Sequence, residues 1–426
     1  MLTAEHNELL TRVGPGTPMG DMLREYWVPA CRSAKLEKDG APERVRLFGE
    51  NFVAFRATDG RVGFIAEGCP HRCASMALAR NEGNGLRCIF HGWKVNVEGE
   101  CVDAPTEPEE RRAAFAKKVP VRSHPVHEAG GMLWVYLGKN KDNPPRFPDY
   151  EFNNLPESHV RPMRGLLRCN WLQGLEALLD SAHVGYLHAE NVKSFANTMI
   201  GTSETTNILL TNGAPNFEFI EKPYGFREGA LRPGKTGNTY ARIREVALPY
   251  FSFIPGRFNG MGTACCSIPI DDYNTAQWYI AFNTESPLDM ERFRTFGMAD
   301  INLDFFNEGM GDFFNMWQQN REAMKNGHWS GFVGKGNPHE DFAVQESMGP
   351  IVDRSMEHLG QADLVIVRAR RMLIDAVRHY EKTGEISFVE NVEFPRIRAL
   401  AITYPSNQDW KKFDAFNPPP ALSAAE

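Results

Sequence analysis

The chain has 426 residues, of which 42% are hydrophobic and 24% charged, a balance typical of packed globular domains and not of disordered chains. This length corresponds to two or three domains. Lys and Arg number 47 against 54 Asp and Glu, a net charge of −7, which excludes a general electrostatic attraction to nucleic acid. Hydrophobic runs fall short of the ~18 residues of a membrane span, and the N-terminus lacks the apolar segment of a secretory signal. We therefore expect a cytoplasmic protein whose eight cysteines are reduced thiols or metal ligands.

The first third of the chain has the pattern of a small antiparallel β domain. Thr17 and Pro18 are typical of the start of a short helix. From residue 44 onward hydrophobic and polar residues alternate, which is the period of a strand with one buried face. Asp59-Gly60 and Glu98-Gly99 are candidate hairpin turns, and residues 132–138 form an apolar run typical of a buried strand. We expect residues 1–155 to form an all-β domain preceded by a helical segment.

The pattern changes in the second part of the chain. Residues 140–156, rich in Asn, Pro and Asp, are expected to be a linker. Residues 170–189 have the apolar stripe of a buried helix. Strand-like segments follow between residues 207 and 282, and helical stretches are expected over residues 290–328 and 341–383. We therefore predict an α+β domain over residues 156–426, a sheet with helices mostly on one side.

Two short pairs of metal-binding residues lie in the first domain. Cys69 and His71 form one pair, and Cys88 and His91 form the other. Such donors suit a Rieske [2Fe–2S] cluster, in which one iron takes two thiolates and the other two imidazoles, or a single zinc ion. The mixed composition of each pair favours the cluster, because zinc fingers commonly pair Cys with Cys and His with His. Cys73 has the spacing of a spare ligand, but we expect a small core residue there.

Asp180, His183 and His188 form a second candidate metal site. On a helix, Asp180 and His183 share one face, whereas His188 lies ~140° from His183. Both histidines can therefore reach one metal only where the helix is bulged or broken, and Gly185 would ease such a break. Two histidines and one carboxylate form the facial triad of non-haem Fe(II) oxygenases, which leaves positions open for O2. Two polar residues of the same helix could support this site or hold the helix to the sheet, Asn170 and Glu176.

The segments CPHR and CIFHGW resemble the Rieske motif of aromatic-ring-hydroxylating oxygenases. The stretches NWLQGLEALLDSAHVGYLH and QESMGPIVDRSMEHLG extend the resemblance over most of the chain, in particular to the phthalate dioxygenase branch. The resemblance implies a Rieske domain followed by a catalytic domain with a helix-grip (START-like) fold. It also implies that Cys69 and Cys88 bind the inner iron of a [2Fe–2S] cluster, that His71 and His91 bind the outer one, and that His183 and His188 bind a mononuclear Fe2+.

In this family the third ligand of the mononuclear iron comes from a C-terminal helix. The acids in that region are Glu340, Asp341, Glu346, Asp353, Glu357 and Asp363. Asp341 stands where the family's ligand falls, whereas Asp353, followed by Arg354, is expected in a structural ion pair. The family implies that Asp180 is a bridge between the two metal centres; direct binding of the iron by Asp180 is the other interpretation.

The resemblance implies the terminal oxygenase of a two-component system. A separate flavin and iron–sulfur reductase would pass electrons from NAD(P)H to the cluster and then to the iron, which activates O2; the chain itself has no GxGxxG after a strand. We expect hydroxylation of a phthalate- or benzoate-type aromatic carboxylate, with cis-dihydroxylation ahead of monooxygenation or O-demethylation of an aryl ether. The family also implies a head-to-tail homotrimer, single or stacked. A pure electron-transfer protein and a zinc-stabilised binding protein are the rival hypotheses.

Arg242 and Arg244 are candidate anchors for the substrate carboxylate. They lie two residues apart in the segment YARIREVALPYF, which places them on one face of an expected strand. A guanidinium can bind a carboxylate bidentately, and the family commonly carries an Arg at the position matching Arg242. The alternative is that both side chains face solvent at a sheet edge.

Overall fold

The computed structural model describes residues 2–194, 203–235, 237–255, 260–291, 302–334 and 336–419. The chain divides into two compact units, an N-terminal unit of Val13–Phe147 and a C-terminal unit of Met1–Arg12 with Pro148–Glu426. Among the described helices, none combines the length and hydropathy needed to cross a bilayer.

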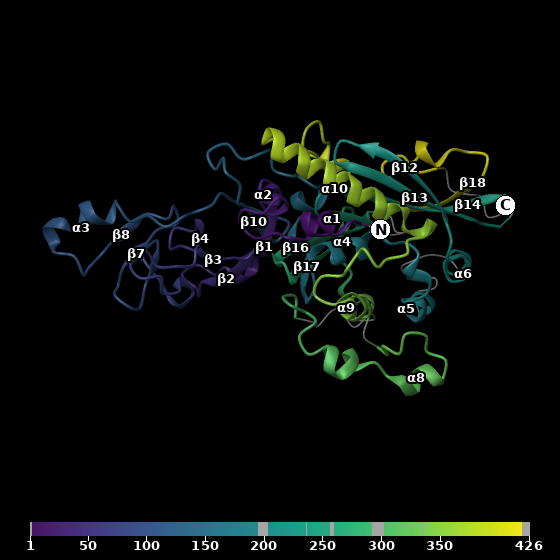
Figure 1. The fold of residues 1–426 in the computed structure, drawn as a ribbon, viewed down its shortest axis with the longest axis horizontal. Helices are drawn as coiled ribbons and strands as arrows, with labels where there is room; N and C mark the ends of the chain where they lie inside the picture. Colours follow the sequence, from purple (N-terminus) through teal and green to yellow (C-terminus); the bar gives the residue numbers. More distant parts are fainter. Residues whose placement is uncertain are drawn as a thin grey trace. The chain divides into compact units, whose positions relative to one another are not determined.

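The N-terminal unit contains three small antiparallel sheets (Figure 1). The first sheet has the order β1 (Trp27–Arg32), β10 (Met132–Tyr136), β9 (Val126–Ala129). The second has the order β2 (Glu43–Leu47), β3 (Glu50–Arg56), β4 (Val62–Ala66). The third has the order β5 (Arg80–Asn81), β6 (Leu86–Arg87), β7 (Lys94–Val95), β8 (Cys101–Asp103). Helix α2 (Pro18–Arg24) precedes these sheets, and α3 (Glu109–Ala116) follows β8. The predicted all-β domain is confirmed.

The predicted turns of this unit lie where glycine is needed. Gly60, between β3 and β4, has φ +91°, and Gly99, between β7 and β8, has φ +83°. Glycine adopts this left-handed backbone without the steric penalty of a side chain. A Cβ at Gly99 would also lie 2.2 Å from the carbonyl oxygen of Val121. The Thr17 side chain accepts from the Gly20 N–H and begins α2 as expected.

The C-terminal unit is built on one antiparallel sheet. Its strand order is β11 (Val160–Leu167), β17 (Asn274–Asn283), β16 (Met261–Asp271), β15 (Phe251–Ile254), β14 (Asn238–Ala247), β13 (Gly225–Pro233), β12 (Asn216–Lys222). Strand β14 is long enough to have two neighbours on one edge, because its first part pairs with β18 (Leu400–Pro405) and its last part with β15. The predicted α+β class is confirmed.

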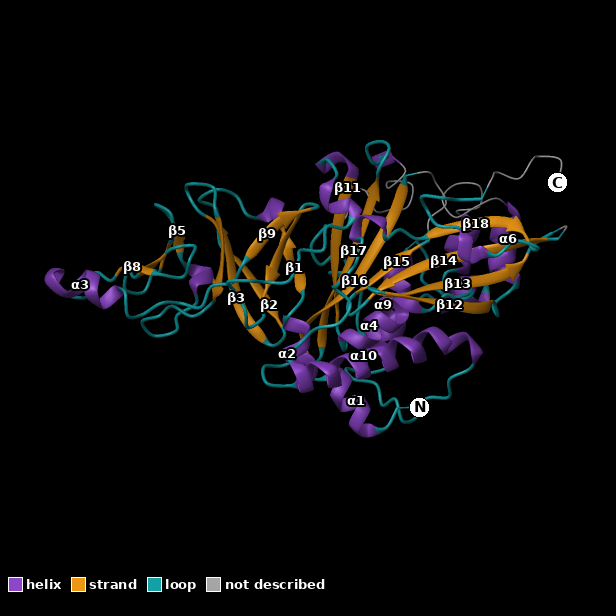
Figure 2. Ribbon diagram, turned by 90° about the horizontal axis from the view of Figure 1, so that it is seen from above, coloured by secondary structure: helices purple, strands orange, loops and turns teal. Residues whose placement is uncertain are grey.

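Helices gather on one side of this sheet, as Figure 2 shows for α1 (Ala4–Thr11), α4 (Trp171–Leu179), α9 (Asn337–Ser347) and α10 (Leu364–Thr383). The apolar stripe of α4 is buried against β15, β16 and β17, and α10 contacts both α1 and α4. Shorter helices complete the unit: α5 (Ala189–Ser194), α6 (Ser203–Thr211) and α8 (Arg321–Lys325).

The contacts divide the chain differently from the predicted boundary at residue 155. Helix α1 packs in the C-terminal unit, where the Trp171 indole donates to the carbonyl of Leu10 at 3.0 Å. The end of the predicted linker also packs in the C-terminal unit, because Tyr150 and Phe152 are buried and their rings contact Phe253. The composition of this segment indicated a linker. Two of its aromatic side chains are nevertheless buried, and they pack the segment against the sheet.

Three predicted helices are shorter than expected. The stretch 170–189 is helical only to Leu179. Of residues 290–328, the described part contains α8 and one irregular turn over Phe313–Gln318, and residues 292–301 lie outside the described part. The stretch 341–383 divides into α9 and α10, and Gly349, with φ +89°, and Pro350 lie between them. Left-handed glycines and prolines end helices that hydrophobic periodicity alone would continue.

Candidate metal centres

Two loops of the N-terminal unit, residues 69–74 and 88–93, have the same backbone hydrogen bonding; we call them the metal-binding loops. In each, the first cysteine donates its N–H to the carbonyl five residues later at 2.8 Å. Its own carbonyl accepts from the N–H four residues later at 2.9 Å. The first cysteines are Cys69, after β4, and Cys88, after β6. The predicted ligand pairs therefore lie in two equivalent turns.

Cys73 has a structural role in the first turn. It occupies the position that Gly92 occupies in the second, and both have left-handed backbone, with φ of +59° and +76°. The Cys73 side chain is exposed, so the expectation of a small core residue was wrong. The reason lies in the turn, because it requires a positive φ at this position and the side chain there points outward.

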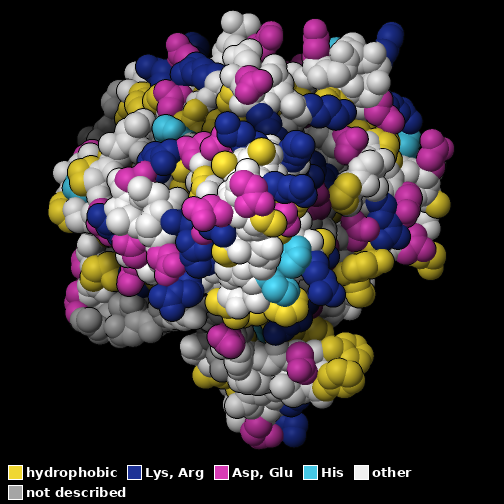
Figure 3. Space-filling view, turned by 90° about the vertical axis from the view of Figure 1, so that its left-hand side faces the viewer, with side chains coloured by type: hydrophobic (Ala, Val, Ile, Leu, Met, Phe, Trp, Pro, Cys, Tyr) yellow, Lys and Arg dark blue, Asp and Glu magenta, His cyan; other side chains and the backbone are white. Residues whose placement is uncertain are grey.

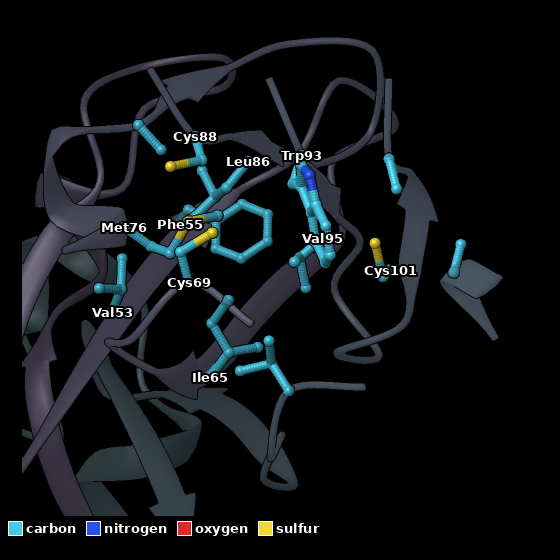
Figure 4. Close-up of a cluster of buried hydrophobic side chains, with 14 of the residues drawn as sticks. Val53, Phe55, Ile65, Cys69, Met76, Leu86, Cys88, Trp93, Val95 and Cys101 are labelled. Atoms are coloured by element: carbon cyan, nitrogen blue, oxygen red, sulfur yellow. The ribbon is translucent and has the colours of Figure 1, made fainter. Parts of the chain in front are cut away.

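The four candidate ligands of the loops converge. Nδ1 of His71 lies 3.2 Å from Nδ1 of His91. Cys69 and Cys88 are buried in the hydrophobic core, where Figure 4 shows them among Phe55 and Leu86. Burial and the neighbouring Cys88 thiol raise the pKa of Cys69 to about 11. A metal-bound cysteine is a thiolate whatever the pKa of its free thiol, and two sulfurs with two imidazole nitrogens fit a [2Fe–2S] cluster of Rieske type.

The histidine end of this site reaches the surface. His71 stacks on Trp93 with ring centroids 4.7 Å apart, and both histidines are only partly buried. Two large apolar side chains next to His91 in the same loop are exposed, Ile89 and Phe90. Figure 3 shows one face of the molecule, on which histidine, hydrophobic and Lys or Arg side chains lie next to one another at the surface. Electrons can therefore reach this site without crossing a thick protein layer.

The C-terminal unit brings together His183, His188 and Asp341, which we call the His–His–Asp triad. One ligand atom from each lies within 4.8 Å of the others. Asp341 Oδ1 is 3.1 Å from Nε2 of His188 and 3.7 Å from Nε2 of His183. Burial raises the pKa of Asp341, but the two histidines outweigh it and hold the pKa below its usual value. Two imidazoles and one carboxylate are the donor set of a facial triad for Fe(II).

The two histidines meet because the helix before them ends early. Asp180 follows α4 with extended backbone, and His183 begins a single 3-10 turn ending at Gly185. The last carbonyls of α4 would be unpaired at such a break, but buried side chains satisfy them. Ser252 Oγ donates to Leu178, and the Arg244 guanidinium donates to Leu179 and Asp180.

Gly185 contributes to the break by its small size. A Cβ there would lie 2.2 Å from the carbonyl oxygen of Leu209 in α6, whereas its φ is not in the left-handed region. The expected break is present, and the glycine allows the close approach of α6.

Each histidine of the triad also contacts a second carboxylate through Nδ1. Asp180 Oδ2 lies 3.2 Å from Nδ1 of His183, and Glu340 Oε2 lies 2.7 Å from Nδ1 of His188. Burial lowers the pKa of His188, but Asp341 and Glu340 outweigh it and raise the pKa to about 9. In the sequence, Glu340 was only one of several acids in this region. Its position next to Asp341 was the feature that could have indicated its place at the site.

The hydrogen bonds and ion pairs of Asn170 and Glu176 go to residues outside the triad, which favours a structural role for each. Asn170 is the N-cap of α4, and its amide donates to the carbonyls of Thr11 and Asp272. Glu176 is buried between two guanidiniums, 2.9 Å from Arg354 and 2.6 Å from Arg370. Both residues hold α4 in place, the second possibility that the sequence left open.

The other acids of the C-terminal region interact away from the triad. Glu346 accepts from the Trp317 indole, and Asp363 accepts from the Gly360 N–H. Glu357 pairs with Arg370. Asp353 accepts from Ser355. The expected ion pair of Asp353 with Arg354 was wrong, because Arg354 is fully buried and pairs with Glu176.

Arg242 and Arg244 lie on β14 and are buried, 5% and 3% exposed, which contradicts the alternative of a solvent-facing sheet edge. Arg244 pairs with Glu228 at 3.0 Å. Nε of Arg242 has no hydrogen-bond partner among the described residues. Sequence analysis missed a third buried guanidinium, Arg232 on β13, whose pKa burial and Arg242 lower to about 10. The three buried guanidiniums interact with two carboxylates, Glu228 and Asp180, and the remaining positive charge is one that a bound anion would neutralise.

Two family models match this chain. One, described as a Rieske [2Fe–2S] domain, matches residues 26–125. The other, described as a LigXa C-terminal domain like region, matches residues 135–422.

Curated relatives match over nearly the whole chain. The phthalate 4,5-dioxygenase oxygenase subunit of Pseudomonas putida is 38% identical over 97% of this chain and 95% of its own length. The 3-chlorobenzoate-3,4-dioxygenase oxygenase subunit of Comamonas testosteroni is 35% identical over 91% of both chains. The 5,5'-dehydrodivanillate O-demethylase oxygenase subunit of Sphingobium sp. (strain NBRC 103272 / SYK-6) is 30% identical, over 88% of this chain and 80% of its own length.

The fold is also similar to that of a solved oxygenase. The carbazole-bound oxygenase in the ferredoxin complex of carbazole 1,9a-dioxygenase has a TM-score of 0.56, with 19% identity. The match covers 89% of this chain and 95% of that chain.

Proposed function

The chain belongs to the Rieske non-haem iron oxygenases, as an oxygenase subunit that uses a [2Fe–2S] cluster and a mononuclear iron, and on that basis we propose that it hydroxylates an aromatic carboxylate. The observation that carries the proposal is the excess of buried guanidinium groups in the same unit as the His–His–Asp triad. Two relatives support it, since their names give phthalate and 3-chlorobenzoate as substrates.

The ligand assignment that we propose follows the geometry of the two sites. Cys69 and Cys88 would hold one iron of the cluster, and His71 and His91 the other. His183, His188 and Asp341 would hold the mononuclear Fe2+, and three protein ligands leave positions open for O2. The bound iron supplies O2 activation; the surrounding residues orient its ligands and bind the substrate.

For the substrate carboxylate we propose Arg242 as the main anchor. Arg244 already donates to Glu228 and to the carbonyls at the end of α4, so its first task is structural. Arg242 is buried and forms no ion pair among the described residues, its Nε has no hydrogen-bond partner there, and a buried charge without an ion pair is costly. A carboxylate beside it would accept charge-assisted hydrogen bonds and remove that cost.

Cis-dihydroxylation of the ring is the reaction we favour. The alternative is monooxygenation, including O-demethylation of an aryl ether. The relative named as an O-demethylase oxygenase subunit supports that alternative, although it is less similar to this chain than the two dioxygenase subunits.

Electrons must come from outside the chain. We propose a flavin and iron–sulfur reductase that uses NAD(P)H and delivers electrons to the cluster at its histidine end. The ferredoxin in the similar carbazole complex supports a separate electron donor. A cytoplasmic location would suit such a partner, and none of the eight cysteines, all of them within the described residues, forms a disulfide.

We further propose a head-to-tail homotrimer, single or stacked, in which the cluster of one chain serves the iron of the next. Asp180 supports this route. Its Oδ2 contacts His183, and its side chain remains 27% exposed. The carboxylate could therefore also accept from His91 of a neighbouring chain and couple the two centres.

The test is turnover of a panel of aromatic acids, and of their uncharged amides, with a compatible reductase, NADH and O2. We expect a cis-dihydrodiol from at least one acid and little product from the matching amide. Equal turnover of acid and amide would contradict the carboxylate anchor. A phenol or a demethylated product would contradict dihydroxylation and support monooxygenation or O-demethylation instead.

A further inference from the structure

Glu340 is a buried carboxylate held by three neutral or weakly basic groups. Its side chain is 1% exposed. Oε2 accepts from Nδ1 of His188 at 2.7 Å and from Nδ2 of Asn191 at 3.1 Å, and Oε1 accepts from Ser330 Oγ at 2.5 Å. A buried carboxylate without partners is strongly unfavourable, and these three hydrogen bonds stabilise Glu340 in its buried position.

The partners of Glu340 come from separate parts of the unit. His188 and Asn191 flank the start of α5, Ser330 lies in the loop before α9, and Glu340 is on α9 itself. Its one basic partner among the described residues is His188. The network therefore converges on a single imidazole and does not serve to neutralise a Lys or Arg.

Both nitrogens of the His188 ring are engaged by consecutive residues of α9. Nδ1 faces Glu340 at 2.7 Å, and Nε2 faces Asp341 at 3.1 Å. A carboxylate at Nδ1 fixes the tautomer with hydrogen on Nδ1, which leaves the lone pair of Nε2 free for a metal.

Asp180, the carboxylate that contacts the other histidine of the triad, is in a different environment. It is 27% exposed and lies 3.2 Å from His183, whereas Glu340 is sealed and 0.5 Å closer to its histidine. Because the Glu340 side chain is buried, it cannot contact a partner outside the unit, and its effect is confined to the metal site.

We propose that Glu340 is a positioning residue for the mononuclear iron: it holds His188 in the tautomer and orientation that present Nε2 to the metal, and Ser330 and Asn191 hold Glu340. The inference rests on the ligand set proposed above.

The experiment measures Fe2+ affinity. Full-length protein with its cluster intact is depleted of mononuclear iron, and Fe2+ is titrated anaerobically by equilibrium dialysis. Glu340→Gln keeps the size of the side chain and an accepting oxygen but removes the charge. We expect it to weaken Fe2+ binding about 10- to 100-fold. Excess Fe2+ should restore its turnover.

The matched control is Glu346→Gln. Glu346 is on the same helix, its side chain is 5% exposed, and it accepts from the Trp317 indole instead of a histidine. We expect its Fe2+ affinity to stay near that of the wild type. Unchanged affinity in Glu340→Gln, or an equal loss in both variants, would overturn the proposal.

Two further variants keep the test decisive. Should circular dichroism and thermal unfolding show that Glu340→Gln does not fold, Ser330→Ala is the second variant. It removes only the donor to Oε1, and we expect a smaller loss of Fe2+ affinity; no loss would overturn the proposal. Asp341→Asn tests the ligand set itself. If Asp341→Asn binds Fe2+ normally, the proposed function of the triad fails; if it loses Fe2+ while Glu340→Gln does not, only the present inference fails.

Discussion

All four candidate ligands of the metal-binding loops lie between Cys69 and His91, whereas the triad joins His183 to Asp341 across most of the C-terminal unit. The loops use two equivalent turns, each closed by its own backbone hydrogen bonds. The triad needs a helix that ends at Leu179, a buried arginine that donates to the carbonyls at that end, and a distant helix that supplies the carboxylate. A local site can be recognised from spacing, while a site assembled by packing depends on the whole unit.

This contrast predicts that the two regions lose their metals independently. Cys88→Ser removes a thiolate from one loop, and we expect complete loss of the cluster and of turnover. Mononuclear iron should remain, because the triad draws none of its ligands from the N-terminal unit. Iron and acid-labile sulfide analysis measures both. Sulfide retained at the wild-type amount would refute the assignment of Cys88.

Asp180 is the proposed connection between the regions. Asp180→Asn should leave the cluster and most of the mononuclear iron in place, since Asp180 contacts His183 only through Nδ1. Electron transfer from the reduced cluster should nearly stop, because the bridge loses its charge. Stopped-flow oxidation of the reduced cluster in the presence of substrate and O2 reports this rate. Loss of the mononuclear iron would instead make Asp180 a ligand, and a fully active monomer in light scattering would exclude the route between subunits.

Substitution of Arg242 tests whether the C-terminal unit, to which we assign the mononuclear iron, also selects the substrate. Arg242→Ala should raise KM for the acid substrate by about 30- to 5,000-fold, which corresponds to the ~2–5 kcal/mol lost when a buried charge pair loses one partner. The iron content and the cluster spectrum should not change. Arg244→Ala is the comparison, and because Arg244 holds the end of α4 we expect it to lower the melting temperature as well. Normal binding of acids by both variants would place the pocket elsewhere.

Asn170 provides the smallest expected effect. Asn170→Ala removes the N-cap of α4 and two side-chain hydrogen bonds, which we expect to cost about 1–2 kcal/mol of unfolding free energy. Turnover per iron should stay at the wild-type value, because Asn170 lies at the far end of α4 from Asp180. Chemical denaturation and a steady-state assay check the two expectations. Reduced turnover with normal stability would return Asn170 to a catalytic role.

The sequence predicted the sheets, their turns and the residues that converge at the two candidate metal sites better than it predicted the helices. Alternation and glycine turns are local signals, and they located β3, β4 and β10. The helix over 170–189 was overextended because periodicity cannot show that Arg244 and Ser252, far along the chain, stabilise an early end. Glu340 was missed for the same reason, since its meaning depends on a contact with His188 that only the folded chain makes.

Metal analysis of Asp341→Asn beside the wild type tests the central claim most directly, because the claim assigns the two kinds of iron to different regions. We predict about three irons and two labile sulfides per wild-type chain, and about two irons with the same sulfide in the variant. The variant should keep the cluster spectrum and lose turnover. Retention of the third iron and of turnover would contradict the assignment of Asp341, and a wild-type protein with one zinc and no labile sulfide would contradict the account as a whole.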